Sequence, residues 1–521
     1  MPMKRNSLEN LTFEPSFFAP EVREGFYISE MIKRHHAAQL SVLAQIDRVC
    51  RKYNLRWYAD NGTLLGCIRH GGYIPWDDDI DICMMRADME RLLDVAGQEL
   101  PEEYQVLNVR RNGYEYLIAQ ITNGLTIGLT GERLQQSHGC PYIVGIDIFA
   151  MDDLYDDPET EEARCKKAAL VIEALTAVKD GLAGTRECRE LIDRVERTFH
   201  RRINRKKHTY RDLLVLAEDI FSEHQDPDAR RVAHLFHWAL KRVRSYEKAW
   251  FGDAIQMPFE NTWLPVPERY DHVLKTEFRD FMRVIKGTGT HEYPVYDNQE
   301  QLLLEQNHCH TGRYTLRKEH LLNHLRREKP AAPPGEKKEI VFLPVKADWW
   351  STMKPFWEKA CADPDVTVTV IAVPYLEADP DGGNPRPVFE RDLFPPEVEL
   401  TDPSAYDFGI HHPDTIVIQH PYDEWSFAVH LPAFFRSGNV RGFTKELVYI
   451  PCHDAASPAE TDELSKKALQ VLIEQPAVVN ADIVVVKDER MRNLYLETLT
   501  RITGEDTLSA WSEKIRSEWG G

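Results

Sequence analysis

The sequence has no long apolar run, and its first residues do not begin a secretory leader. No stretch approaches the about 18–20 consecutive apolar residues of a membrane-spanning helix. The charged start Met1-Pro2-Met3-Lys4-Arg5 is not followed by the apolar core of a signal peptide. These absences predict a cytoplasmic protein without a transmembrane segment, for which peripheral contact with the inner face of the membrane stays open.

Paired-cysteine motifs are also missing. The nine cysteines are scattered and include no Cys-x-x-Cys pair, which is typical of reduced thiols in a reducing compartment. Cys67 and Cys83 are expected to be small core residues. His308-Cys309-His310 has the residue types of a zinc fragment but lacks further ligands at a useful spacing.

Basic residues are too few to balance the acidic ones. The chain has 64 Lys and Arg against 84 Asp and Glu, a formal net charge of −20. This charge argues against a nucleic-acid partner and against broad attraction to an anionic membrane. At 521 residues the chain is long enough for two to four domains.

The most informative segment is a run of carboxylates between apolar residues. Asp77, Asp78, Asp79 and Asp81 are framed by Ile74-Pro75-Trp76 before them and by Ile80 and Ile82. Like charges this close repel one another unless a cation neutralises them, and hard divalent cations prefer carboxylate oxygens. A solvated acidic loop and a non-catalytic calcium loop are the alternatives, but the spacing does not fit an EF-hand.

The alternation of polar and apolar residues distinguishes Asp79 and Asp81 from the other aspartates of this run. Asp79-Ile80-Asp81-Ile82 has the pattern of a strand, on which Asp79 and Asp81 point to the same face about 7 Å apart. A third carboxylate, Asp147, lies inside the apolar run 144–149. Upstream, Asn61-Gly62-Thr63 is a turn signal, after which backbone N–H groups are available to a phosphate.

These motifs together resemble a known family. The string Gly62-Thr63-Leu64-Leu65-Gly66, then Arg69-His70, then 74–81, closely resembles the LicD family of phosphotransferases, which is related to the fukutin proteins. A second block, 145–149 with Asp152, is also similar, although Ala150 stands where the family usually has Pro. The closing Phe278-Arg279-Asp280 is a loose match, and the resemblance covers roughly residues 30–290.

The resemblance implies a nucleotidyltransferase-type fold and a metal-dependent reaction. Asp79, Asp81 and Asp147 would hold Mg²⁺, with Mn²⁺ as the alternative ion. The ion would bridge the diphosphate of a CDP-linked donor, and Asp147 is the first choice for the group that takes the acceptor proton. The acceptor would be a glycan or a lipid-linked glycan.

Other residues of the motif are expected to contact the donor. Gly62 and Thr63 would donate to its phosphate, while Arg69 and His70 would neutralise developing negative charge. Trp76 would stack on a base or cover a quaternary ammonium, with a core position as the alternative. Asp78, like its neighbour Asp77, would orient the ligands or belong only to the loop.

The expected fold class is α/β. Residues 1–26 would form an arm, and 27–325 an α+β catalytic domain with a helix at 28–53, a strand at 55–59 and a helix at 87–99. A helical insertion at about 158–250 would contain helices at 161–178, 186–205, 210–223 and 228–246. After a linker at 326–338, strands alternating with helices over 339–521 predict a Rossmann-like parallel sheet.

This last region resembles one GT-B lobe of the CDP-glycerol glycerophosphotransferases, and we expect it to bind the acceptor or another partner. The sequence does not distinguish choline, ribitol and glycerol phosphates as the transferred group, and it leaves the oligomeric state open. Two other functions remain: transfer of NMP from an NTP, and a non-catalytic glycan-binding scaffold.

Overall fold

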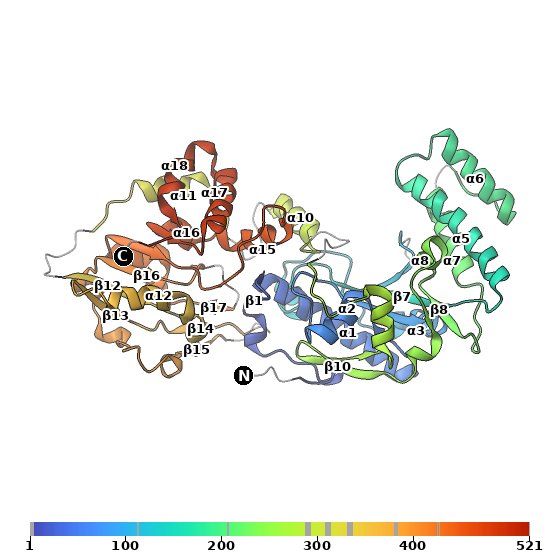
Figure 1. Cartoon of the computed structure of the whole chain (residues 1–521), viewed down its shortest axis with the longest axis horizontal. Helices are drawn as coiled ribbons and strands as arrows, with labels where there is room; N and C mark the ends of the chain where they lie inside the picture. The colour runs from blue at the N-terminus through green and yellow to red at the C-terminus, as the bar shows by residue number, and fades with distance from the viewer. Residues whose placement is uncertain are drawn as a thin grey trace. The chain divides into compact units, whose positions relative to one another are not determined.

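The computed structural model describes residues 5–111, 114–205, 208–286, 293–307, 314–330, 337–379, 384–424, 426 and 428–519. The chain forms two compact units (Figure 1). The first comprises Met1–Thr12, His35–Ile127 and Tyr142–Gly287, and the second comprises Phe13–Arg34, Gly128–Pro141 and Thr288–Gly521. The domain limits expected from the sequence stay predictions. The segment His308–His310 and residues 331–336 of the expected linker lie outside the described residues.

The first unit is built on a mixed sheet. Its main strand order is β3 (Tyr58–Ala59), β4 (Asp81–Met85), β7 (Gly145–Asp153), β6 (Ala119–Thr122) and β5 (Gln105–Leu107). β4 and β7 are parallel, and the other neighbours along this order are antiparallel. Ile82, Met84, Ile146 and Ile148 are buried, because alternate side chains of the central strands point into the core.

Helices α1 (Glu30–Tyr53), α2 (Asn61–Arg69), α3 (Arg86–Glu99) and α9 (Tyr270–Phe278) belong wholly or largely to this unit, as does the hairpin β10 (Ile255–Phe259)–β11 (Thr262–Val266). The predicted helix at 28–53 corresponds to α1, and the one at 87–99 corresponds to α3. Cys67 and Cys83 are buried free thiols, which confirms their prediction as core residues.

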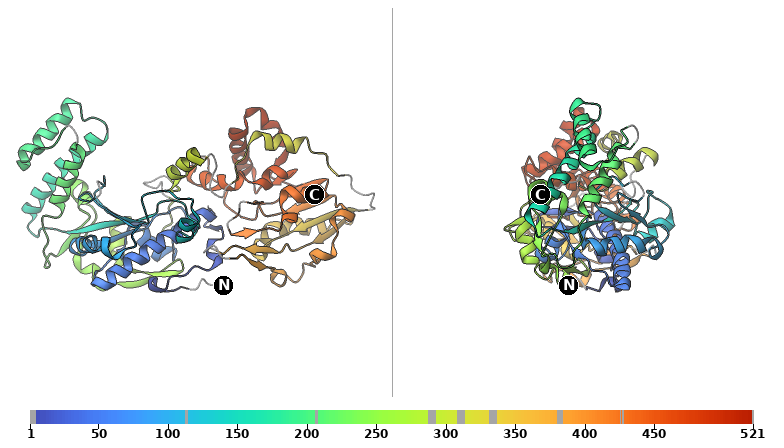
Figure 2. Two further views of the ribbon diagram at one scale, coloured as in Figure 1. Left: turned by 180° about the vertical axis from the view of Figure 1, so that it is seen from behind. Right: turned by 90° about the vertical axis from the view of Figure 1, so that its right-hand side faces the viewer.

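Beyond the sheet, α5 (Pro158–Lys179), α6 (Arg186–Phe199) and α7 (Thr209–Phe221) pack on one another and extend away from the strands (Figure 2). Asp157 and Thr185 cap the first two helices through their side chains. These helices share an apolar core that includes Val171, Ile192 and Leu213. Three of the helices predicted in the insertion are therefore present.

The fourth predicted helix, at 228–246, is wrong. This segment instead forms β8 (Arg231–Ala233), α8 (Leu235–Lys241) and the start of β9 (Ser245–Glu247). β8 pairs with β9 and with the far end of β7, at Asp152 and Asp153. The hydrogen bonds offered by that long strand favour β structure where the local pattern predicted a helix.

The second unit contains a six-stranded parallel sheet, as predicted. The strand order is β13 (Val366–Val370), β12 (Lys338–Leu343), β16 (Thr415–Ile418), β18 (Glu446–Tyr449), β19 (Ile483–Val485) and β20 (Ile515–Arg516). A smaller antiparallel sheet has the order β15 (Arg386–Val388), β14 (Tyr375–Glu377) and β17 (Val429–His430). The α/β fold class is therefore confirmed.

The helices of this unit are α4 (Gly131–Gln136), α10 (Asp297–Asn307), α11 (Lys318–Leu325), α12 (Trp350–Cys361), α13 (Phe408–His411), α14 (Ser437–Val440), α15 (Glu463–Ile473), α16 (Pro476–Asn480), α17 (Glu489–Thr503) and α18 (Leu508–Lys514). The segment 13–34 adds the hairpin β1 (Glu21–Arg23)–β2 (Phe26–Ile28). Tyr27 belongs to the apolar core of this unit, and its hydroxyl lies 3.0 Å from that of Tyr422.

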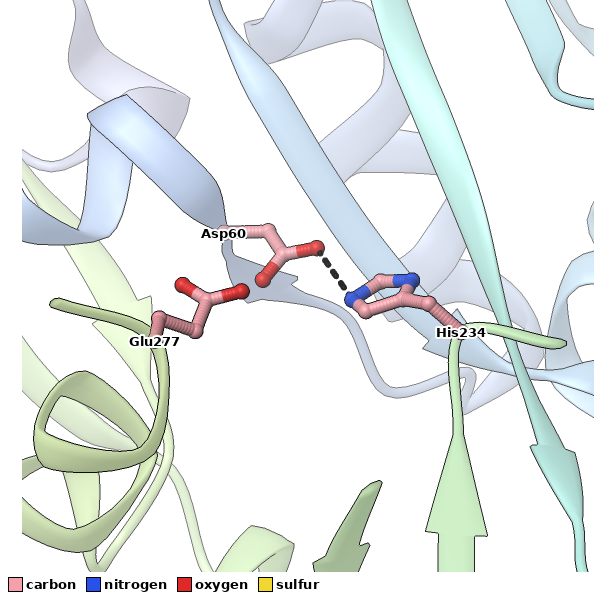
Figure 3. A group of neighbouring side chains, drawn as sticks. All are labelled: Asp60, His234 and Glu277. Carbon is pink, nitrogen blue, oxygen red and sulfur yellow. Dashed lines mark ion pairs between the residues drawn. The ribbon is translucent and has the colours of Figure 1, made fainter. Parts of the chain in front are cut away.

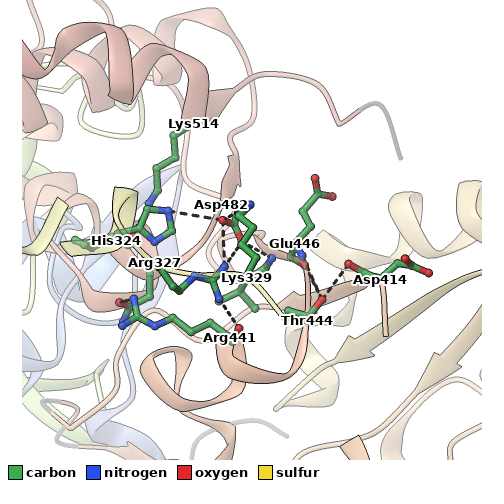
Figure 4. A network of polar contacts seen from close by, with 12 residues as sticks. His324, Arg327, Lys329, Asp414, Arg441, Thr444, Glu446, Asp482 and Lys514 are labelled. Atoms are coloured by element: carbon green, nitrogen blue, oxygen red, sulfur yellow. Dashed lines mark hydrogen bonds and ion pairs between the residues drawn. The ribbon is translucent and has the colours of Figure 1, made fainter. Parts of the chain in front are cut away.

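A polar network holds the segment after α11 against the parallel sheet (Figure 4). Asp482 accepts from Arg327 at 3.0 Å, pairs with Lys329 at 2.8 Å, and accepts from the Leu447 N–H at 2.8 Å. Burial alone would raise the pKa of Asp482, but these donors lower it below its usual value. The carboxylate therefore joins two strands to the connection that precedes β12.

Among the described residues, no helix combines the length and apolar content required to cross a bilayer.

Candidate active site

Two of the predicted metal ligands lie on neighbouring strands. Asp81 is the first residue of β4, and its partner in the parallel register is Asp147 of β7. The strand expected over 79–82 begins at Asp81 in the structure, and Asp79 lies just before it, close enough for its charge to act on Asp81. A turn in which the Asp77 N–H donates to the Ile74 carbonyl at 2.9 Å comes first, and the chain reaches the ladder only after it.

The electrostatics around Asp81 indicate a site with excess negative charge. Burial raises the pKa of Asp81 well above its usual value, and the charges of Asp79, Asp147, Asp60 and Asp77 raise it further. A bound cation would remove this penalty, because it favours the ionised form of each carboxylate. The all-carboxylate donor set fits a hard divalent cation.

Asn61 orients one of these carboxylates. Its side-chain N–H donates to Asp81 Oδ2 at 3.0 Å, and its carbonyl oxygen accepts from Arg244 Nη1 at 2.8 Å. The backbone of Asn61 has φ of 45°, in the left-handed region that Asn tolerates better than most residues. The local pattern around Asn61 predicted only a turn and carried no signal for this role.

The first turn of α2 lies against the aspartate run. The Thr63 hydroxyl oxygen accepts from the Asp81 N–H at 2.9 Å, so it positions the start of β4. A Cβ atom added at Gly62 would lie 2.2 Å from Asp77 Oδ2. An alanine at this position would therefore displace the Asp77 carboxylate, and the predicted phosphate contacts of Gly62 and Thr63 stay predictions.

Asp147 is held from β6. Gln120 Nε2 donates to Asp147 Oδ1 at 2.7 Å, and the two residues are register partners. This contact also was not found from sequence, because a Gln in a short strand carries no signal for the strand that it pairs with.

The remaining predicted residues have other identified contacts. Arg69 Nη1 donates to the carbonyl oxygens of Phe281 and Arg283, each at 3.2 Å. His70 follows the last residue of α2, and its N–H caps the Gly66 carbonyl. The amine of Lys286 lies 5.7 Å from the ring centre of Trp76, so this ring already faces a cation of the chain.

Asp78 is fully buried next to the site, and its predicted substrate contact stays a prediction. Asp152, in the second block of the resemblance, forms a buried ion pair instead. Its two carboxylate oxygens accept from Arg86 Nε at 2.7 Å and Nη2 at 3.1 Å.

Comparison with known proteins points to the same part of the chain. The family model described as LicD/FKTN/FKRP, nucleotidyltransferase domain, matches residues 54–121. This range includes Asn61, the aspartate run, β4 and most of β6.

Three relatives share shorter segments. The lipopolysaccharide cholinephosphotransferase LicD of Haemophilus influenzae is 33% identical over 121 residues, 23% of this chain and 44% of that protein. Uncharacterized proteins of Rickettsia prowazekii and Rickettsia typhi are 45% and 37% identical over 47 and 59 residues, 9% and 11% of this chain and 18% of each relative. The matches thus span less than half of each relative. Residues 54–121 are therefore similar to the nucleotidyltransferase domain of the LicD family.

Proposed function

We propose that this protein is a phosphotransferase that moves a phospho-alcohol from a CDP-linked donor to a glycan or lipid-linked glycan. The observation that supports this most is the alignment of Asp81 and Asp147 on parallel strands within and beside the LicD-family segment. The relative from Haemophilus influenzae is named as a cholinephosphotransferase of lipopolysaccharide, so choline phosphate is the first group to test.

In this mechanism Asp79, Asp81 and Asp147 hold Mg²⁺ or Mn²⁺, and a bound ion supplies charge neutralisation at the diphosphate and the leaving CMP. Asn61 and Gln120 fix the two strand carboxylates through the hydrogen bonds at 3.0 and 2.7 Å. Asp147 accepts the proton of the attacking hydroxyl. The backbone of α2 near Gly62 donates to phosphate oxygens, because the N-terminus of a helix favours anions.

Removing either of the proposed metal-binding carboxylates Asp79 and Asp81 should slow the reaction. Asp81→Asn and Asp79→Asn should each lower Mg²⁺-dependent CMP release by at least about 100-fold, the scale of losing one electrostatic group in an active site. CMP release is measured with CDP-choline, CDP-ribitol and CDP-glycerol in turn.

The matched control is Asp94→Asn, since Asp94 is an exposed carboxylate that pairs with Arg111 on the surface. Unchanged turnover in the Asp81 and Asp79 variants would exclude the proposed ligands. Consumption of an NTP with pyrophosphate release would instead indicate a nucleotidyltransferase. Glycan binding without turnover of either donor class would indicate a scaffold.

A further inference from the structure

A second group of ligand-type side chains lies in the first unit, and the sequence motifs do not include it. Asp60 precedes α2, His234 follows β8, and Glu277 lies in α9. One ligand atom of each residue lies within 4.8 Å of those of the other two. Figure 3 shows the three side chains directed toward one another from these separate segments.

Three buried atoms of this cluster have no identified hydrogen bond, although Asp60 Oδ2 and His234 Nε2 form an ion pair with each other. The three atoms are Asp60 Oδ2, His234 Nε2 and Glu277 Oε2. Asp60 and His234 are 2% and 4% exposed, and the side chain of Glu277 is 0% exposed. Glu277 Oε2 is thus the one of these three atoms without an identified contact, and a buried polar atom of this kind favours a bound partner.

The spacing of the atoms fits coordination. Asp60 Oδ2 and His234 Nε2 are 3.1 Å apart. Two ligands bound tetrahedrally to one zinc ion, each at about 2.0–2.1 Å, lie about 3.4 Å apart. Small side-chain movements would therefore bring these two atoms and Glu277 Oε2 onto one ion.

Contacts with neighbouring residues engage one carboxylate oxygen of Glu277 and leave the other, Oε2, available to bind an ion. The other oxygen of Glu277, Oε1, accepts from the Tyr246 hydroxyl at 2.9 Å and lies 3.5 Å from Arg244 Nε. Such contacts orient a metal-binding carboxylate through the oxygen that does not bind. Arg244 also donates to Asn61, which in turn donates to Asp81. The cluster is thus connected to the candidate active site through two hydrogen bonds.

One ligand of the cluster borders a cavity. His234 lines a cavity of about 420 Å³, whose wall also includes Phe149, Phe221 and His237.

We propose that Asp60, His234 and Glu277 bind a transition-metal ion of the Zn²⁺ type, separate from the Mg²⁺ proposed at Asp79, Asp81 and Asp147. An imidazole ligand favours zinc and similar ions over Mg²⁺ and Ca²⁺. Three protein ligands leave a fourth position for water or a substrate oxygen. The proposal goes beyond the proposed function, since the ion would bind whether or not the donor carries CDP.

The test uses the full chain, stripped with a chelator and titrated with Zn²⁺, with bound metal measured by elemental analysis after gel filtration. We expect one equivalent of zinc per chain for the wild type and none for His234→Ala. His237→Ala is the matched control, because His237 lies three residues along the chain and is not part of the cluster. It should bind one equivalent.

A folding defect in His234→Ala would be detected by circular dichroism, and Glu277→Gln then takes its place, since it keeps the shape of the side chain. Co²⁺ titration of the wild type provides a second measurement, with visible absorption expected from a site with a nitrogen ligand.

Asp81→Asn should keep its zinc equivalent while losing transfer, which separates this proposal from the proposed function. If the wild type binds no zinc, or if the His234 and Glu277 variants bind as much zinc as the wild type, then His234 and Asp60 form only an internal ion pair.

Discussion

Gly62 and Gly66 have close neighbours of different kinds. A Cβ at Gly62 would meet the terminal oxygen of Asp77, at 2.2 Å, whereas a Cβ at Gly66 would meet the backbone carbonyl of Gly72, at 2.4 Å. A carboxylate can rotate away, but a backbone carbonyl in a packed turn cannot. The two positions therefore separate an effect on the site from an effect on the fold.

We expect Gly62→Ala to lower transfer by about 10-fold or more, with a loss of stability below about 1 kcal/mol, because it displaces Asp77. Gly66→Ala should lower the free energy of unfolding by about 1–3 kcal/mol. Transfer rates and urea unfolding are the measurements.

Gly97→Ala is the control for both variants, since nothing lies within 4 Å of a Cβ there and Ala favours the α3 helix. If Gly62→Ala transfers at the wild-type rate, Asp77 belongs only to the loop and does not orient ligands.

Single residues were predicted from sequence where a local pattern carried the information. Asp81 and Asp147 each stand in an apolar strand run, and the structure places them side by side. Glu277 and His234 stand in segments whose local pattern shows no sign of the other. Their convergence depends on where β8 and α9 pack, and this is a tertiary property.

At the scale of elements, Arg86 joins β4 to two other elements. It begins α3 directly after β4, and its guanidinium pairs with Asp152 of β7 and with Glu218 of α7. Arg86 and Asp152 are both buried, and the nearby carboxylates raise the pKa of Arg86 although burial opposes this. The ion pair thus fixes the strand that carries Asp81 against the strand that carries Asp147.

Asp152→Ala should lower the free energy of unfolding by about 3–5 kcal/mol, because it leaves a buried guanidinium without this partner. Asp94→Ala, which breaks an exposed pair with Arg111, should cost less than about 1 kcal/mol. Urea unfolding of both variants measures the difference. If both variants lose a small and equal amount of unfolding free energy, then Glu218 alone is enough to compensate the buried charge of Arg86.

Elements with a strong period were predicted well. The helix at 28–53 agrees with α1 to within a few residues, and the strands and helices expected to alternate over 339–521 form the parallel sheet of the second unit. The wrongly predicted elements are those whose secondary structure depends on pairing with distant parts of the chain. β8 and β9 depend on the far end of β7, and the start of β4 depends on the turn at Ile74–Asp77.

At the scale of the whole molecule, the second unit should be sensitive to acid. Burial lowers the pKa of His420 to about 4, although a hydrogen bond to the Tyr422 carbonyl opposes it. Burial also lowers the pKa of His453 to about 3. Both imidazoles must therefore stay neutral in the folded protein.

An unfolded histidine titrates near pH 6.5, so below this pH the unfolded chain binds more protons than the folded one. Stability should consequently fall as the pH drops from about 6.5 toward 4, by at most about 1.4 kcal/mol per pH unit for each histidine. Urea unfolding at pH 7.5, 6 and 5 measures this fall. His420→Gln should reduce the slope, and a flat profile in the wild type would contradict the prediction.

The hydrogen bond between Tyr27 and Tyr422 joins residues 395 positions apart in one core. On a ribosome that adds about 5–20 residues per second, Tyr422 emerges about 20–80 s after Tyr27. The side chain of Tyr27, which is buried in the finished protein, has no completed core to enter during that interval. The nascent chain should therefore present Tyr27 to chaperones until the segment that contains Tyr422 has been made.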